Sequence, residues 1–249
     1  MSITILDNHP FLSYYTMNTA NHMNLTCKAI LFDLDGVLIH SFVVIERHWR
    51  KWAARHQIPF ERVNAVLHGR TSAEIIRLVA PHLDPEEEGR LRESEEGMDT
   101  DGLQVFEAAP RLLHSLPPDS WAVVTSGNLQ TATTRLRYGG LPVPTVLVTA
   151  GDVKRSKPAP DGYLLAAQRL GVPPGQCIVI EDAPAGIEAA RAAGMRAIAV
   201  ATTHPPEALE KATFIVRELA DLTIKMDENH LWITPNIAGL LEPENYCPD

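Results

Sequence analysis

The chain has 249 residues, of which 45% are hydrophobic and 21% are charged, a composition typical of a water-soluble globular protein. Its formal net charge of −9 argues against nucleic acid or an anionic membrane as a partner, because such binders need clustered lysine and arginine. No apolar run approaches the roughly 18 residues of a membrane-spanning helix, so we expect no membrane segment.

Cysteine and histidine are spaced without a metal-site pattern. The cysteines are few and widely separated, which predicts reduced thiols of a cytoplasmic protein and no disulfide framework: Cys27, Cys177 and Cys247. Three histidines recur every eight residues, a spacing that drifts around a helix, and we interpret them as solvent-exposed: His40, His48 and His56.

The N-terminal residues 1–27 show no hydrophobic period and no basic segment followed by an apolar one. We therefore expect a partly disordered extension without a secretory signal. The next stretch, residues 29–38, begins with a short apolar run that predicts a buried strand. This strand ends in Asp33 and Asp35, and Gly36 follows them as a flexible turn residue.

Residues 42–106 predict helices only. Apolar residues recur at helical spacing, Ser72 is a plausible N-cap, and Pro85 suits the first position of an acidic helix that runs to about Glu96. The expected helices cover residues 43–56, 61–67, 73–80 and 85–96.

From residue 107 onward, short apolar runs alternate with helical segments, which predicts crossover units and a parallel sheet covered on both faces. The expected strands are 121–124, 146–148, 178–180, 197–200 and 214–216, and the expected helices are 108–116, 129–138, 161–170, 185–193 and 206–211. The fold class is thus α/β, a doubly wound parallel sheet with an inserted all-helical cap. We assign residues 28–41 and 107–235 to the core, residues 42–106 to the cap and residues 236–249 to a tail, with a possible β-hairpin formed by 222–225 and 231–234.

Polar residues follow four of the predicted strands, at the edge where ligands bind in such sheets. They are Asp33 and Asp35, then Thr125, Ser126 and Asn128, then Lys157, then Glu181 and Asp182. Clustered carboxylates fit a hard divalent cation such as Mg²⁺, whereas hydroxyl donors and a lysine fit a phosphoryl group. Each motif alone has an ordinary explanation, as a helix cap, a surface lysine or a charged helix N-terminus. Their joint occurrence at successive strand ends favours a site.

Four of these motifs resemble those of the haloacid dehalogenase-like hydrolase superfamily: Asp33-Leu34-Asp35-Gly36, Thr125-Ser126-Gly127, Lys157-Pro158, and Glu181-Asp182-Ala183-Pro184. A helical insertion after the first motif is similar to the small helical-cap branch, which includes sugar phosphatases, glycerol-phosphate phosphatases and β-phosphoglucomutase. The resemblance implies a Rossmann-like core and a cytoplasmic, magnesium-dependent phosphatase. Such an enzyme hydrolyses small sugar or polyol phosphates through an aspartyl phosphate.

The resemblance also implies roles for individual residues. Asp33 would be the nucleophile and Asp35 the general acid and base. Mg²⁺ would be held by Asp33, the main-chain carbonyl of Asp35 and Asp182, with Glu181 behind them. Ser126 and Lys157 would bind the phosphoryl oxygens, with Thr125 and Asn128 nearby, and Arg70 would reach the substrate from the cap.

Two alternatives remain open at this point. A β-phosphoglucomutase-like mutase is favoured weakly by Val37, which stands where phosphatases usually carry threonine. It is opposed by Ser72, which stands where the mutase cap has an arginine. The second alternative is a regulator that binds phosphorylated metabolites without catalysis, and the complete set of matched catalytic residues argues against it. His40-Ser41 and residues 106–108 also depart from the family's usual hinge sequences.

Overall fold

The computed structural model describes residues 24–67, 70–227 and 230–241. Outside the described part of the chain lie residues 1–23, the loop residues His68 and Gly69, and the tail beyond residue 241. The predicted disorder of residues 1–23 therefore stays a prediction. Among the described residues, no helix is both long and apolar enough to cross a lipid bilayer.

A seven-stranded sheet forms the core, and all its strands are parallel except β12 (Leu240–Leu241), which runs antiparallel to β9 (Phe214–Val216). The central strand β2 (Ala29–Phe32) lies between β5 (Trp121–Val124) and β7 (Cys177–Glu181), with Phe32 level with both Val123 and Ile180. The carboxyl ends of these three strands therefore meet at one edge. The remaining strands are β6 (Leu147–Val148) and β8 (Arg196–Val200).

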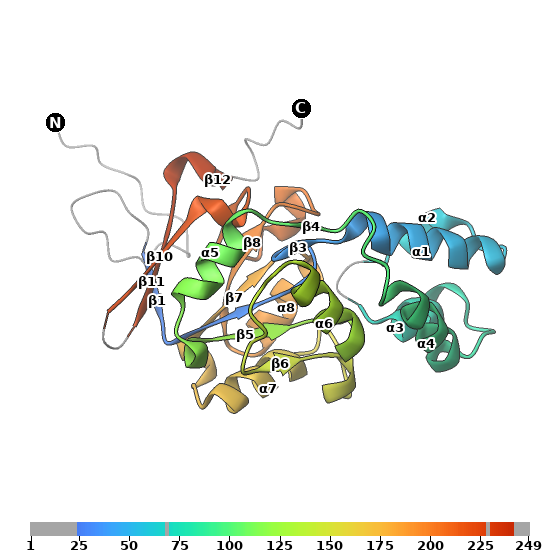
Figure 1. Ribbon diagram of the computed structural model, residues 1–249, viewed down its shortest axis with the longest axis horizontal. Coiled ribbons are helices and arrows are strands. Elements are labelled where there is room, and N and C mark those ends of the chain that lie inside the picture. Colours follow the sequence, from blue (N-terminus) through green and yellow to red (C-terminus); the bar gives the residue numbers. More distant parts are fainter. Residues whose placement is uncertain (1–23, 68–69, 228–229, 242–249) are drawn as a thin grey trace.

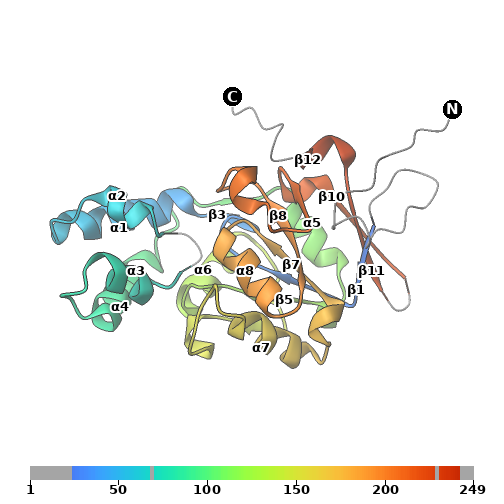
Figure 2. The same ribbon diagram turned by 180° about the vertical axis from the view of Figure 1, so that it is seen from behind.

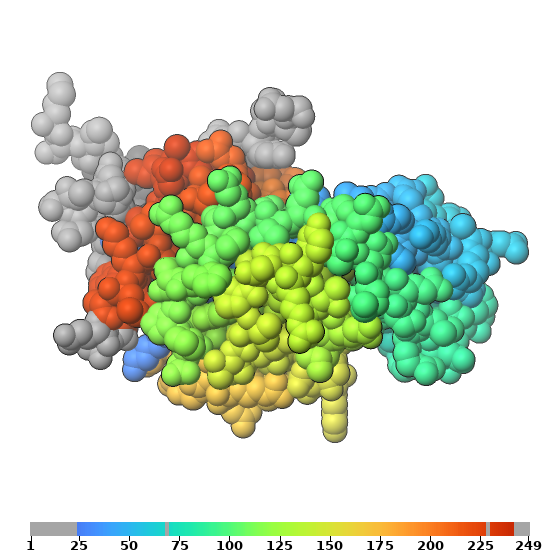
Figure 3. Space-filling model, in the orientation of Figure 1, coloured from blue at the N-terminus to red at the C-terminus, as the bar shows by residue number. Residues whose placement is uncertain are grey.

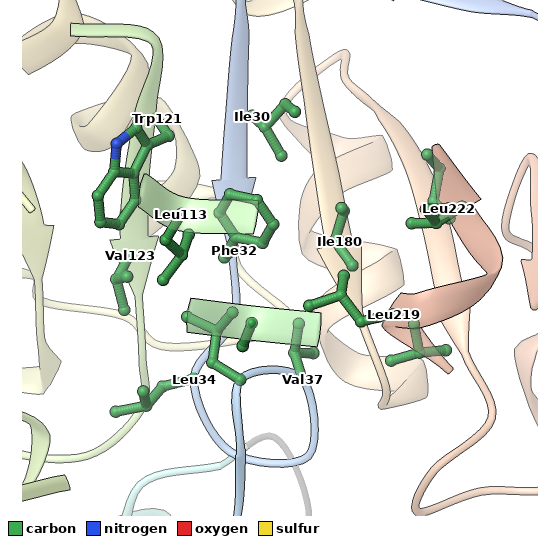
Figure 4. Close-up of a cluster of buried hydrophobic side chains, with 14 of the residues drawn as sticks. Ile30, Phe32, Leu34, Val37, Leu113, Trp121, Val123, Ile180, Leu219 and Leu222 are labelled. Atoms are coloured by element: carbon green, nitrogen blue, oxygen red, sulfur yellow. The ribbon is translucent and has the colours of Figure 1, made fainter. Parts of the chain in front are cut away.

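Helices cover both faces of the sheet, as the predicted crossover units require (Figures 1 and 2). Side chains alternate along β2, so Ile30 and Phe32 join one apolar cluster while Ala29 and Leu31 join the other. Figure 4 shows the first cluster, in which Phe32 faces Leu113 of α5 (Ala108–Ser115). Helices α5 and α6 (Leu129–Tyr138) pack on this face, and α7 (Asp161–Leu170) and α8 (Pro184–Ala192) pack on the other.

Four helices make a separate layer beyond the edge where the strands end, and in the space-filling view they stand directly against the core (Figures 1 and 3). They are α1 (Phe42–Arg55), α2 (Phe60–Asn64), α3 (Ser72–Val79) and α4 (Pro85–Glu96). Their apolar faces bury Trp49, Trp52 and Ile76 in a cluster of their own. Two short antiparallel strands join this layer to the core, β3 (Ile39–His40) and β4 (Gln104–Val105).

Two local predictions for these helices need correction. Helix α3 is capped by Thr71 in a capping box with Glu74, whereas Ser72 is the first helical residue and accepts a hydrogen bond from Arg92. His48 is buried, not solvent-exposed, because its Nε2 contacts the Asp99 carboxylate at 2.8 Å. His40 and His56, also expected to be exposed, are half-buried. The start of α4 at Pro85 is confirmed, with Asp84 as its N-cap.

A second, three-stranded sheet lies at the end of the core opposite the cap (Figures 1 and 2). The predicted C-terminal hairpin is confirmed as β10 (Leu222–Met226) and β11 (Leu231–Pro235). Its third strand, β1 (Leu25–Cys27), falls in the segment expected to be disordered. It is ordered because Leu25 and Cys27 enter the core while their backbone pairs with β11. Short 3₁₀ helices complete the fold, at Pro118–Ser120, Ala150–Asp152, Pro174–Gln176, Pro206–Leu209, Leu219–Asp221 and Ile237–Gly239.

Candidate active site

A pocket between the sheet edge and the cap contains all eight core residues that the sequence singled out, together with Arg70 from the cap. Asp33 follows β2, Thr125 follows β5, and Glu181 ends β7. Parallel strands in register bring these positions together although they are far apart in sequence. The order and register of the parallel strands therefore bring the predicted strand-end residues together in one pocket.

Lys157 lies at the bottom of this pocket between two carboxylates. Its ammonium group contacts Asp33 Oδ1, lies 2.6 Å from Glu181 Oε1 and donates to the carbonyl of Val124 at 3.3 Å. Tyr163 donates a hydrogen bond to the same Glu181 oxygen at 2.8 Å. Burial alone would lower the pKa of Lys157, but the two carboxylates raise it well above its ordinary value. Lys157 is therefore a permanent cation.

The carboxylates of Asp33, Glu181 and Asp182 are all buried, and one oxygen of each lies within 4.8 Å of the others. Burial, reinforced by the neighbouring acids, raises the pKa of Asp33 to about 8 and that of Asp182 well above its usual range. Burial would also raise the pKa of Glu181, but contact with Lys157 lowers it. One lysine cannot balance three carboxylates. Hard oxygen donors with excess negative charge fit a divalent cation.

Two glycines allow these acids to pack so closely to the backbone. Gly36 has φ of +85°, and a Cβ there would lie 2.0 Å from Asp182 Oδ2. At Gly186 a Cβ would lie 1.7 Å from Glu181 Oε1. Thr203 Oγ1 donates to Asp182 Oδ2, and the backbone N–H groups of Asp182 and Ala183 donate to Glu181 Oε2 at 3.0 and 3.1 Å. Both carboxylates are thus fixed in place.

The loop after β5 lies at the N-terminus of α6, the end of a helix whose dipole favours an anion. Thr125 Oγ1 accepts a hydrogen bond from the Gly127 N–H at 3.0 Å. Asn128 is the N-cap of α6, since its Oδ1 accepts from the Thr131 N–H at 2.8 Å. Ser126 lines the pocket beside them. The helix-cap and anion-site interpretations of this loop are therefore compatible.

Asp35 stands apart from the group of three buried acids. Its Oδ1 accepts hydrogen bonds from Ser41 Oγ at 2.6 Å and from Arg135 Nη1 at 2.5 Å. Arg70 lines the cap side of the pocket, where its Nη1 donates to the carbonyl of Val66 at 3.3 Å. Asp35 and Arg70 thus face the pocket from opposite layers, one from the core and one from the cap.

Comparison with known proteins assigns the chain to a family. A family model described as a haloacid dehalogenase-like hydrolase matches residues 27–194. The chain belongs to this family. It is 40% identical over 210 residues to hexitol phosphatase A of Escherichia coli (strain K12), covering 82% of this chain and 97% of that protein. It is 33% identical over 226 residues to glycerol-1-phosphate phosphohydrolase 2 of Saccharomyces cerevisiae (strain ATCC 204508 / S288c), covering 85% and 87%.

A solved hydrolase from Pseudomonas syringae superposes on this haloacid dehalogenase-like hydrolase with a TM-score of 0.68. The two are 24% identical, and the superposition covers 76% of this chain and 92% of that one, a similarity that concerns the fold. The doubly wound core with its inserted helices is thus the fold of structurally related hydrolases.

Sequence reasoning missed four charged residues that the hydrolase places at the boundary between core and cap. Glu93 accepts from Asn128 Nδ2 at 2.9 Å, and Glu96 accepts from Arg135 Nη2 at 2.6 Å. Arg92 contacts Glu96 as well. Glu93 and Glu96 looked like part of an ordinary acidic helix, and Arg135 lay in a helix without a motif. Glu93 and Glu96 are three residues apart and so lie on one face of the helix. This spacing was the only sign in the sequence that they could act together.

Proposed function

We propose that the chain is a magnesium-dependent phosphatase that hydrolyses small sugar or polyol phosphates through an aspartyl phosphate on Asp33. The observation that carries this proposal is the buried group of Asp33, Glu181 and Asp182 around Lys157, beside the donor-rich loop after β5. The named activities of hexitol phosphatase A and glycerol-1-phosphate phosphohydrolase 2 support the substrate class.

In the first step, a carboxylate oxygen of Asp33 attacks phosphorus while the bond from phosphorus to the sugar oxygen breaks. The leaving oxygen takes its electron pair and receives a proton from Asp35. In the second step, Asp35 removes a proton from a water molecule that attacks the aspartyl phosphate. Inorganic phosphate leaves, Asp33 is again a carboxylate, and Asp35 again carries a proton.

The buried carboxylates are suited to Mg²⁺, which Asp33, Asp182 and the main-chain carbonyl of Asp35 would hold, with Glu181 orienting Lys157 behind them. When bound, the ion neutralises charge, so that an anionic nucleophile can approach an anionic phosphate. Lys157 neutralises the same charge from the other side, and its raised pKa keeps it cationic across the working pH range.

The remaining groups bind and orient the substrate. Ser126 and Lys157 hold the phosphoryl oxygens, with Thr125 and Asn128 beside them at the N-terminus of α6. Arg70 contacts the sugar or polyol from the cap. In this scheme residues 42–106 act as the cap over a core formed by residues 28–41 and 107–235. The enzyme works in the cytoplasm, which suits the buried free thiols of Cys27 and Cys177.

The mutase alternative has weaker support. The position of the mutase's cap arginine is Ser72, which accepts a hydrogen bond from Arg92 at 2.7 Å. An arginine thus reaches this place from another helix, but it is already paired with Glu96. A phosphatase releases one inorganic phosphate for each alcohol formed, whereas a mutase returns the phosphoryl group to its sugar.

The test is a panel of sugar and polyol phosphates, each incubated with Mg²⁺ and with excess chelator, while free phosphate and free alcohol are measured. We expect equal release of both products with Mg²⁺, and no turnover in chelator until Mg²⁺ is restored. Undiminished turnover in excess chelator would refute the metal assignment. Isomerisation of a sugar phosphate without phosphate release would favour the mutase.

A further inference from the structure

A chain of alternating charges crosses from the core to the cap above the reacting groups. Asp35 pairs with Arg135, Arg135 with Glu96, and Glu96 with Arg92. The side chains of Arg135 and Glu96 are each only 5% exposed. Buried charges persist only when they are paired, and two acids here alternate with two arginines. The mechanism described above uses only the first member of this chain.

The two donors to Asp35 both contact the same oxygen. Ser41 Oγ lies 2.6 Å and Arg135 Nη1 lies 2.5 Å from Oδ1, so both hydrogen bonds fix the carboxyl group through the same oxygen. The other oxygen, Oδ2, is left for the proton transfers, and its direction is set by the hold on Oδ1. Asp35 keeps 23% of its side chain exposed, whereas Arg135 keeps 5%. A buried, doubly paired guanidinium is a rigid support for a partly exposed acid.

Arg135 is itself held by the cap. Helix α6 presents Asn128 and Arg135 seven residues apart, hence on one face, and α4 presents Glu93 and Glu96 on one face at a spacing of three. Two hydrogen bonds join these faces: Asn128 donates to Glu93 at 2.9 Å, and Arg135 donates to Glu96 at 2.6 Å. The support for the acid is therefore complete only while α4 lies on α6.

We propose that Arg135 is a positioning residue for the acid–base carboxyl of Asp35, and that Glu96 of the cap holds Arg135 in that position. The proposal rests on the proposed function. The ion pairs of Arg135 are with Asp35 and Glu96 and not with the nucleophile Asp33. In this proposal Arg135 aims Oδ2 of Asp35 at the leaving oxygen. Because Glu96 belongs to the cap, the acid is aimed when the cap rests on the core and the substrate is enclosed.

The test is a double-mutant cycle on single-turnover phosphoryl transfer, with glycerol 1-phosphate as the alkyl ester and p-nitrophenyl phosphate as the aryl ester. Arg135→Met should slow transfer from the alkyl ester about 10- to 100-fold, a part of what general acid catalysis contributes. Transfer from the aryl ester should change less than about threefold, because nitrophenolate leaves without a proton. Arg135→Lys should recover part of the loss. In an Asp35→Asn background, Arg135→Met should slow transfer from the alkyl ester no further.

Two exposed neighbours provide matched controls. Arg137→Met removes the same charge from the same helix, and Glu95→Gln stands beside Glu96→Gln on α4. Neither control should alter transfer from either ester, whereas Glu96→Gln should repeat the alkyl-selective loss to a smaller degree. Thermal melting is measured for each variant. If Arg135→Met does not fold, the ratio of the two ester rates in Arg135→Lys decides in its place.

The proposal would be overturned, and a structural role shown, if Arg135→Met slowed transfer from both esters equally. The same holds if Arg135→Met slowed transfer as much in the Asp35→Asn background as in the parent. Arg135→Met rates that match those of Arg137→Met would also overturn the proposal. These outcomes leave the proposed function standing. If the parent enzyme in Mg²⁺ transfers phosphate from neither of these esters nor from any sugar or polyol phosphate of the panel, the proposed function fails and the positioning role fails with it.

Discussion

Replacing Asp35 with asparagine tests the proton transfers that we propose for this residue while leaving its place in the structure unchanged. The amide oxygen of asparagine can accept from Ser41 and Arg135 as Oδ1 does now, so the side chain keeps its shape and both hydrogen bonds. What it loses is the ability to give and take a proton at Oδ2. The expected effect is therefore the contribution of general acid–base catalysis.

That contribution is about 10²–10⁴-fold, or roughly 3–5 kcal/mol at 1.36 kcal/mol for each factor of ten. A sugar or polyol phosphate, whose alkoxide needs a proton, should bear the full loss in the first step. An aryl phosphate should form the aspartyl phosphate at nearly the parent rate. Hydrolysis of that intermediate still needs a base, so it should stall in both cases.

The assay mixes Asp35→Asn with p-nitrophenyl phosphate and follows nitrophenolate. We expect a burst near one equivalent, then slow turnover, with labelled phosphate trapped on Asp33 and located by peptide mapping. Asp33→Asn, the control, should show no burst and carry no label. Steady turnover without a burst in Asp35→Asn, or label retained by Asp33→Asn, would refute the assignment of the two roles.

Three further predictions follow from individual contacts. Arg70→Ala should raise KM for a sugar phosphate severalfold and leave an aryl phosphate unchanged, because Arg70 reaches the pocket from the cap; equal kinetics with both esters would contradict this. Gly186→Ala should raise the Mg²⁺ concentration for half-maximal activity, since its Cβ would displace the Glu181 carboxylate, whereas Gly175→Ala, in open space, should match the parent. Hydrogen bonds from His48 and Arg47 outweigh burial and lower the pKa of Asp99 to about 2. Asp99 therefore stabilises the fold above pH 4, so urea unfolding of Asp99→Asn should show a deficit at pH 7 that shrinks as the pH falls toward 2.

The core of the fold followed from short-range signals in the chain. Runs such as 121–124 and 178–180 are short, apolar and flanked by helical segments, and each became a buried parallel strand. Once the strands were known to be parallel, their carboxyl ends had to share one edge. The meeting of Asp33 with Lys157, 124 residues away, was predictable for that reason.

Contacts between layers were not predictable in the same way. Strand β1 forms because Leu25–Cys27 pairs with β11 about two hundred residues later, and residues 25–27 alone carry no sign of that partner. His48 is buried because Asp99, on the segment leading back from the cap, contacts it. Arg135 and Glu96 looked like ordinary helix-surface residues until α4 was placed on α6.

The sequence by itself determined the class of fold and the chemistry available at the sheet edge, because strand patterns and strand-end residues are local properties. Only the tertiary structure decided how the cap lies on the core, and with it which charged side chains are buried and paired. The physical reason is that pairing energies depend on the distance between groups and on the exclusion of water, and neither is a property of neighbours along the chain. Asp33 was therefore visible in the sequence, whereas the support for Asp35 became visible only in three dimensions.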